Sequence, residues 1–136
     1  YSGTKAAGRA HFWCGVYYRD IAKDYNAALE HFKQAAFDDE ANSVTVTGCI
    51  GDMYIMMNDM EQGASWLEKA AKQANASDSR DFTGPLLNLK AGKAYMELGN
   101  NSKAEALLQF VIDNYDKRSQ EYGEAEKLLS LLKAKS

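Results

Sequence analysis

Four side chains in this sequence have the chemistry for metal binding or nucleophilic attack, namely two cysteines and two histidines. His11 and Cys14 lie one helical turn apart, so both could touch one metal ion. A zinc site normally has three or four protein ligands, and the chain contains neither Cys-x-x-Cys nor His-Glu-x-x-His. We therefore interpret Cys14 as a core thiol and His11 as a histidine between helices, and we expect no metal and no cofactor.

Catalysis by Cys14 with His31 as its base is a second chemical reading. It would also need an oxyanion hole and a third, orienting group, and no pattern in the sequence supplies them. A phosphate-binding Gly-x-x-x-x-Gly-Lys-Ser/Thr loop is absent as well. We expect no enzyme activity. A disulfide between Cys14 and Cys49 stays open as an alternative, although it needs Cα atoms within about 7 Å while helix axes pack about 8–10 Å apart.

Composition and charge narrow the class of protein further. The chain has 136 residues, of which 46% are hydrophobic, and this suits one domain with a buried core. Its net charge of −3 lacks the clustered positive charge of a nucleic-acid-binding surface. The printed sequence has no run of 18 apolar residues and no signal-like leader. It starts at Tyr1, in a segment that reads like the closing turn of a helical repeat, so we expect at least one further helix upstream in the parent protein.

The elements that would position these residues carry a repeated pattern. Gly-x-x-Tyr occurs three times, and each copy is followed by a small, a large and a small residue at intervals of four and three. This spacing places three side chains on one face of a helix, with small residues where a neighbouring helix comes close. The glycine and tyrosine copies are Gly15/Tyr18, Gly51/Tyr54 and Gly92/Tyr95, and the sets that follow them are Ala28/Phe32/Ala35, Gly63/Leu67/Ala70 and Ala104/Leu108/Val111.

The pattern predicts three pairs of helices and a last, seventh helix. The polar stretch at residues 74–81 is predicted to be a flexible loop between the second and third pairs. In the third pair, Pro85 suits the first turn of a helix, and Ser102 with Glu105 has the spacing of a capping box. The last helix would cover the apolar edge of the third pair. The first two pairs are expected at about residues 4–20, 26–37, 43–58 and 60–73, and the last helix at about 119–134.

Helix pairs of about 34 residues with this pattern resemble the tetratricopeptide repeat, or TPR. The resemblance covers nearly the whole chain and implies an all-α, right-handed solenoid of antiparallel helix pairs in a single domain. The first copy has one extra residue, which we interpret as a loop insertion within residues 19–24, and the usual early tryptophan is replaced by His11, Thr47 and Asn88. The repeats are expected at about residues 4–40, 43–77 and 83–116, with a C-terminal capping helix at 119–134.

In TPR domains the first helix of each pair lines a concave surface that usually binds the ligand. Carrying the groove positions of the family onto this sequence gives a lining that mixes apolar residues with charges of both signs. Phe12 and Val16 occupy positions that hold polar ligands for a carboxylate in some TPR domains, so a carboxylate clamp is not expected. An amphipathic helix or an extended hydrophobic peptide fits better, and the alternative is that a missing repeat or the C-terminal helix fills the groove. The positions are Arg9, Phe12, Val16, Arg19, Thr45, Gly48, Asp52, Ile55, Leu86, Leu89, Lys93 and Met96.

The sequences of some segments are similar to one group within the TPR proteins. The segments that begin at Tyr1, Phe82 and Tyr95 are similar to bacterial YfgM-like envelope proteins. In that group a transmembrane helix precedes a periplasmic TPR domain that assists assembly or translocation complexes. The resemblance implies a non-catalytic scaffold for a protein or peptide on the periplasmic side of the inner membrane, anchored only through a segment outside this chain. The alternatives are a cytoplasmic location and a structural module for homo-oligomerisation.

Overall fold

The computed structural model describes residues 4–135, and all regular structure in that range is helical. The predicted all-α class is confirmed. Residues 1–3 of the segment interpreted as a closing turn lie outside the described residues, whereas Thr4 caps α1 and residues 5–7 form the first turn of that helix. The helices are α1 (Lys5–Tyr17), the π-helical turn η1 (Tyr18–Ala22), α2 (Tyr25–Gln34), α3 (Glu40–Met56), α4 (Met60–Asn75), α5 (Gly84–Glu97), α6 (Asn101–Asn114) and α7 (Gln120–Lys135).

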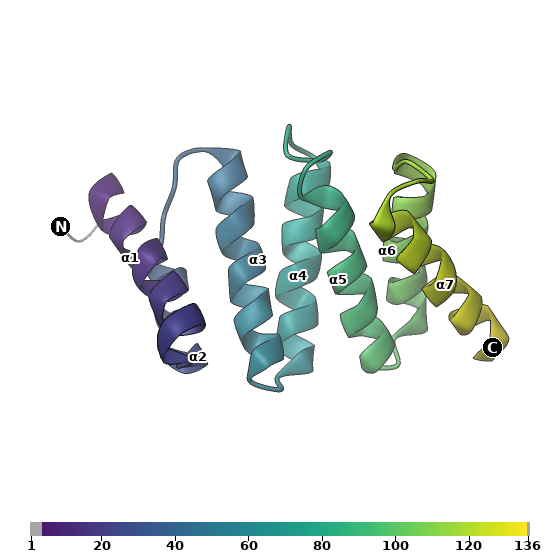
Figure 1. The fold of residues 1–136 in the computed structure, drawn as a ribbon, viewed down its shortest axis with the longest axis horizontal. Coiled ribbons are helices and arrows are strands. Elements are labelled where there is room, and N and C mark those ends of the chain that lie inside the picture. The colour runs from purple at the N-terminus through teal and green to yellow at the C-terminus, as the bar shows by residue number, and fades with distance from the viewer. Residues whose placement is uncertain (1–3, 136) are drawn as a thin grey trace.

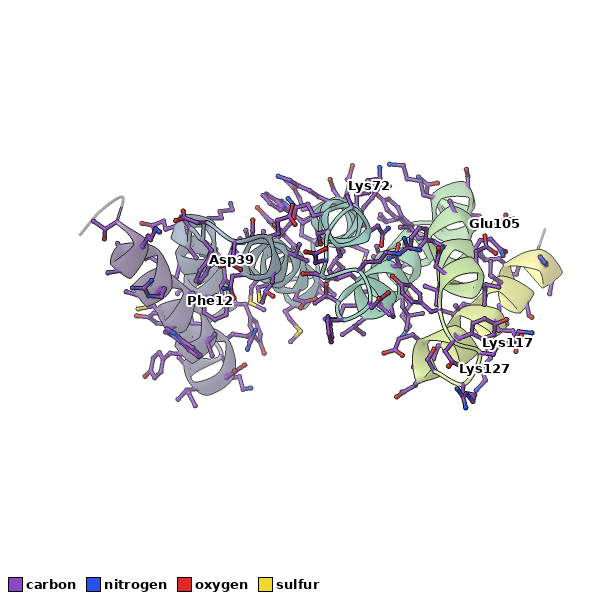
Figure 2. The ribbon with its side chains drawn as sticks, turned by 90° about the horizontal axis from the view of Figure 1, so that it is seen from above. Phe12, Asp39, Lys72, Glu105, Lys117 and Lys127 are labelled. Atoms are coloured by element: carbon purple, nitrogen blue, oxygen red, sulfur yellow. The ribbon has the colours of Figure 1, made fainter. Side chains whose placement is uncertain are left out.

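The helices stand side by side in one elongated row (Figure 1). Helix α1 lies at one end and α7 at the other, and the connections alternate between the two edges of the row, so that consecutive helices run in opposite directions. Each helix packs mainly against its neighbours in the chain, and α7 also contacts α5. Seen from above, Lys72 of α4 and Lys127 of α7 point to opposite sides of the row (Figure 2). This arrangement is compatible with a helical repeat.

Side-chain caps determine where several helices begin. The residue before the helix accepts a hydrogen bond from a backbone N–H three residues later, which satisfies a donor that the helix cannot pair internally. Pro85 lies in the first turn of α5, as predicted. The predicted capping box at Ser102 is wrong, because the cap of α6 is Asn100, two residues earlier, and the helix begins at Asn101. The side-chain caps of α2, α3, α4 and α6 are Asp24, Asp39, Asp59 and Asn100.

Two connections differ from their sequence predictions. The extra residue of the first pair lies in the π-helical turn η1, because a π turn adds a residue to a helix without opening a loop. Lys23, which follows η1, adopts a left-handed backbone with φ 56°. The stretch at residues 74–81, which was predicted to be flexible, is held by hydrogen bonds near both of its ends. Tyr115 donates a hydrogen bond to the Arg80 carbonyl at 2.8 Å, and Asn75 and Asn88 bond to each other through their amides at 2.8 and 3.3 Å.

The three glycines of the Gly-x-x-Tyr copies make the same contact in all three helix pairs. A Cβ atom built on Gly15 would lie 2.6 Å from the Phe32 ring, which is closer than real side chains approach. The corresponding distance is 2.8 Å between Gly51 and the Leu67 side chain and 2.8 Å between Gly92 and the Leu108 side chain. Each glycine therefore lets the first helix of its pair approach the large residue on the second helix.

The buried side chains form two cores along the row. The N-terminal core joins α2 and α3 through Phe32, Ile50 and Met53, among others, and Phe12 of α1 packs against it. The C-terminal core runs through α4, α5, α6 and α7 and includes Leu67. The two cores thus follow the row of helices.

Candidate functional site

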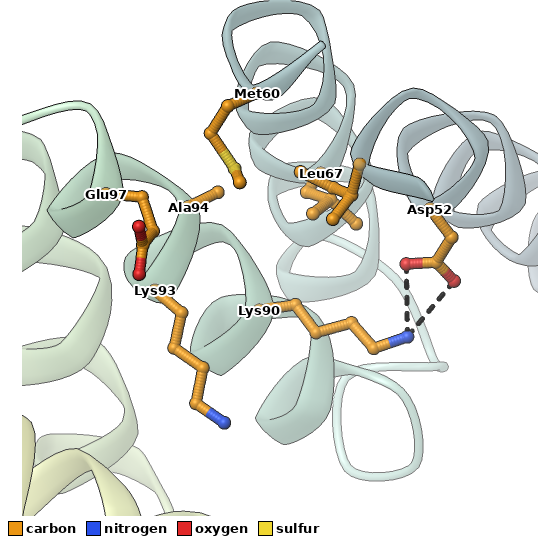
Figure 3. Close-up of a pocket in the computed structure, with 8 residues that line it drawn as sticks. Asp52, Met60, Leu67, Lys90, Lys93, Ala94 and Glu97 are labelled. Carbon is orange, nitrogen blue, oxygen red and sulfur yellow. Dashed lines mark hydrogen bonds and ion pairs between the residues drawn. The ribbon is translucent and has the colours of Figure 1, made fainter. Parts of the chain in front are cut away.

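An apolar pocket opens between α3, α4 and α5 (Figure 3). Its volume is about 320 Å³. Met60, Leu67 and Ala94 face one another across it, and Ile55 completes the apolar lining. The charged residues at its rim are Asp52, Lys90, Lys93 and Glu97. The site therefore combines an apolar floor with a rim of both signs of charge.

Ion pairs between helices hold the charged residues of the rim in place, and each pair joins α5 to another helix on the same side of the row. Lys90 of α5 reaches Asp52 of α3, with Nζ 3.1 and 3.2 Å from the two carboxylate oxygens (Figure 3). Lys93 of α5 lies 2.7 Å from the carboxylate of Glu124 on α7. The hydrogen bond from Lys93 lowers the pKa of Glu124, so this carboxylate is ionised at neutral pH. Two of the rim cations thus already have partners, and the floor is the part open to a ligand.

A second pocket continues the first toward the N-terminal end. It has a volume of about 440 Å³ and shares Asp52, Ile55 and Lys90 with the first pocket. Arg19 lies in it and is held by Asp20 at 2.7 Å. The two pockets adjoin at these shared residues between η1 and α5, and we call them together the groove. Its further lining residues in this part are Lys23, Tyr25, Met53 and Met56.

Four of the residues predicted from the sequence line the groove: Arg19, Asp52, Ile55 and Lys93. They lie one or four residues after the glycine of their copy. Val16 and Met96 share these spacings but are partly buried and pack against the N-terminal and C-terminal cores, respectively. The spacing after the glycine therefore identifies part of the lining and does not determine all of it.

The other predicted positions lie outside the groove, and their register explains this. Phe12, Gly48 and Leu89 each precede a glycine by three residues, so they lie on the same helix face as that glycine and turn toward the packed interior. Leu89 is only 3% exposed and belongs to the C-terminal core, so its assignment to the groove is wrong. The positions six residues before each glycine are exposed and line neither pocket. They are Arg9, Thr45 and Leu86.

The sequence reasoning missed Met60, Lys90 and Glu97. Lys90 lies two residues before its glycine, a position that the family groove does not include, and its partner Asp52 lies one residue after the preceding glycine. The opposite charges at these two registers could have indicated a bridge between neighbouring first helices. Met60 opens the second helix of its pair, whereas the predicted lining came only from the first helices.

The cysteines and histidines do not come together as a reactive centre. Both cysteines are free, and Cys14 is exposed whereas Cys49 is buried, so the interpretation of Cys14 as a core thiol is wrong. Burial raises the pKa of the Cys49 thiol, which disfavours the reactive thiolate. His31 places its Nδ1 atom 3.1 Å from that of His11, and its ring stacks on Tyr18. Within residues 4–135, no group of three His, Cys, Asp or Glu side chains is placed to hold a metal ion.

None of the helices described is both long and apolar enough to cross a membrane. Comparison with family models and with curated proteins gives no match for the chain. The groove and the repeated helix contacts are therefore the features of the chain that bear on its function.

Proposed function

We propose that this chain is a non-catalytic scaffold that binds a protein or peptide segment in its groove, built as a TPR-like right-handed solenoid of three repeats with a capping helix. The equivalent contacts of Gly15, Gly51 and Gly92 support three repeats. Each glycine meets the large residue of its own second helix, as expected when one helix hairpin is repeated along the chain. The repeats then span about residues 4–40, 43–77 and 83–116, and α7 is the capping helix.

The apolar pocket between α3, α4 and α5 is the observation that carries the binding function. Its floor offers Ile55, Met60 and Ala94 to a ligand, and burying one large apolar side chain there stabilises a complex by about 1.5–3 kcal/mol. Lys93 and Glu97 flank the floor and can orient charges on either side of that side chain. An amphipathic helix or an extended segment with an apolar anchor has this chemistry.

Affinity capture with a matched pair of variants tests the groove. Met60→Glu places a carboxylate at the apolar floor, in the first turn of α4, where a negative charge is compatible with the helix dipole. Leu131→Glu introduces the same group on exposed α7, away from the groove. A partner from a native envelope extract should be retained by the wild type and by Leu131→Glu and lost from Met60→Glu.

A retained partner is then reduced to a peptide and titrated against the protein. The methyl resonance of Met60 should shift with saturation if the peptide enters the pocket. Equal retention by all three proteins, together with an unshifted Met60 methyl group, contradicts binding in the groove.

The cellular role of the scaffold follows the YfgM-like resemblance, in which such a domain assists assembly or translocation complexes at the periplasmic side of the inner membrane. A cytoplasmic location is the alternative. Self-association is the second candidate function, and the exposed Trp13 and Tyr17 of α1, with Ile21 of η1, favour it. A molecular mass that rises with concentration in sedimentation would support it over binding in the groove.

A further inference from the structure

The two histidines of the sequence meet between α1 and α2. His11 of α1 and His31 of α2 place their Nδ1 atoms 3.1 Å apart, although 20 positions separate these residues in the sequence. Both side chains are partly exposed to solvent, and neither lines the groove. The binding of a peptide in the groove therefore does not use this pair of imidazoles.

The His31 ring is held in place by its surroundings. It stacks on the ring of Tyr18, with the two centroids 5.3 Å apart and the planes only 8° from parallel. His31 also lies in the last turn of α2, which ends at Gln34, and the carbonyl end of a helix carries partial negative charge. A cation beside this ring is thus favoured by the helix backbone, and the stacked ring loses little freedom when it binds one.

The distance between the two Nδ1 atoms matches the spacing of two imidazole ligands on one metal ion. Imidazole nitrogens lie about 2.0–2.1 Å from Zn²⁺, so two of them at a ligand–metal–ligand angle of roughly 90–110° are about 2.8–3.4 Å apart. The 3.1 Å between His11 and His31 falls within this range. The two rings come from different helices and already stand at the separation that a metal ion requires.

The proton between the rings does not prevent metal binding. In the hydrogen bond of the pair, one Nδ1–H donates to the other Nδ1. If the proton of the donor ring moves to Nε2, both neutral rings have a lone pair on Nδ1, which is the form of histidine that binds metals. This change of tautomer releases no proton from the pair.

We propose that His11 and His31 bind one divalent transition-metal ion through their two Nδ1 atoms and so link α1 to α2. Imidazole suits Zn²⁺ and Ni²⁺, whereas Mg²⁺ and Ca²⁺ prefer oxygen ligands. Within residues 4–135 no third His, Cys, Asp or Glu side chain joins the pair, so water fills the other coordination positions. The site is therefore open and exchangeable, unlike the closed sites with four protein ligands that hold structural zinc.

Cys14 is not a ligand of this site. The sequence places it one turn after His11, but its side chain is exposed, and the partner that the structure brings to His11 is the imidazole of His31. A metal ion on the histidine pair would join two segments that are 20 residues apart and so restrict the opening of the first helix pair.

Titration of Zn²⁺ into the protein with ¹⁵N-labelled histidine tests the site without any substitution. His11 and His31 are the only histidines in the sequence, so all ring-nitrogen signals come from this pair. The two Nδ1 signals should shift together at neutral pH, with a stoichiometry of one Zn²⁺ ion per protein. Shifts at Nε2, shifts of one ring alone, or shifts that do not saturate overturn the proposal.

Three variants identify the ligands by isothermal titration calorimetry. His11→Gln and His31→Gln should each weaken Zn²⁺ binding by at least about tenfold, because one of two ligands is lost. Cys14→Ser should bind Zn²⁺ as the wild type does. Zn²⁺ should also raise the melting temperature of the wild type and of Cys14→Ser, but of neither histidine variant. Zn²⁺ binding that survives His31→Gln, or that is lost in Cys14→Ser, contradicts a site made by the two imidazoles.

Discussion

Three glycines have the same task, which is to bring two helices closer than any other residue allows. Glycine within a helix costs about 1 kcal/mol relative to alanine because the unfolded chain is more flexible. At Gly51 that cost is offset by contact with Leu67, whose side chain and backbone nitrogen occupy the space that a Cβ atom would take. Gly123 on α7 has no such neighbour within 4 Å of its Cβ position.

The two glycines should therefore respond oppositely to alanine. We expect Gly51→Ala to destabilise the protein by about 2 kcal/mol despite the gain in helix propensity, since Leu67 and α4 must move. Gly123→Ala should stabilise it by about 0.5–1 kcal/mol. Urea denaturation followed by circular dichroism measures both changes. Similar stabilities for the two variants would show that Gly51 is not at a close helix contact.

At this scale the sequence predicts the helix contacts better than the groove. The spacing of Gly15, Gly51 and Gly92 before a large residue anticipates three packed pairs. The groove prediction fails at Leu89, because positions that point into the core and positions that point into the groove are only one or two residues apart along a helix. The family positions alone could not distinguish these faces, and the pairing of Asp52 with Lys90 depends on how far apart α3 and α5 lie.

Helices α4, α5 and α6 are linked by a single carboxylate. Glu68 on α4 accepts a hydrogen bond from the Tyr95 hydroxyl of α5 at 2.7 Å and another from Lys103 of α6 at 3.3 Å. Burial by itself would raise the pKa of Glu68, but the hydrogen bonds from Tyr95 and Lys103 outweigh it and place the pKa below its usual value. The ionised carboxylate therefore stabilises the packing of three elements.

Removing this charge should have an effect that depends on pH. A carboxylate whose pKa is lowered by folding stabilises the protein above its unfolded pKa of about 4.3, and this contribution is lost as pH falls through the folded pKa. Glu68→Gln should thus cost about 1 kcal/mol at pH 7 and much less at pH 3. Urea titrations at both pH values test this, with exposed Glu105→Gln on α6 as the control. An equal loss at both pH values would contradict a role for the charge.

Element positions follow the sequence closely where a cap or a proline is present. Pro85 and the pairing of small with large residues locate α5 and its partner, and the last helix begins at Gln120, one residue from its predicted start. The positions that differ from the sequence predictions have local causes. Asn100 caps α6 in place of Ser102, since its side chain accepts a hydrogen bond from the Lys103 backbone N–H. The turn η1 has no sequence signal, since π-helical hydrogen bonding depends on the tertiary position of the turn.

The two ends of the molecule are unequal. Helix α7 packs on both α5 and α6 and buries Leu129 and Leu132, whereas Cys14 and Tyr17 at the corresponding places on α1 face solvent. In an array where each helix pair is stabilised by its neighbours, local stability falls toward an end that lacks a neighbour.

Hydrogen exchange should reveal this gradient. We expect the amides of α1 to exchange at least about tenfold faster than those of α5 under native conditions, because opening α1 exposes little additional apolar surface. Mass spectrometry of peptic fragments measures both regions in one sample. Uniform protection along the row would show that the array unfolds as one unit.

The inequality of the ends also limits how large an assembly can become. An open filament needs a surface at the far end of the molecule that is complementary to the surface at the first end. Ser130 on α7 stands where Gly15 stands on α1, and its hydroxyl bonds back to the Glu126 carbonyl, so a side chain occupies the place where the next helix would have to approach. Because the two ends of the described array do not match, we expect that the chain at high concentration forms no fibres.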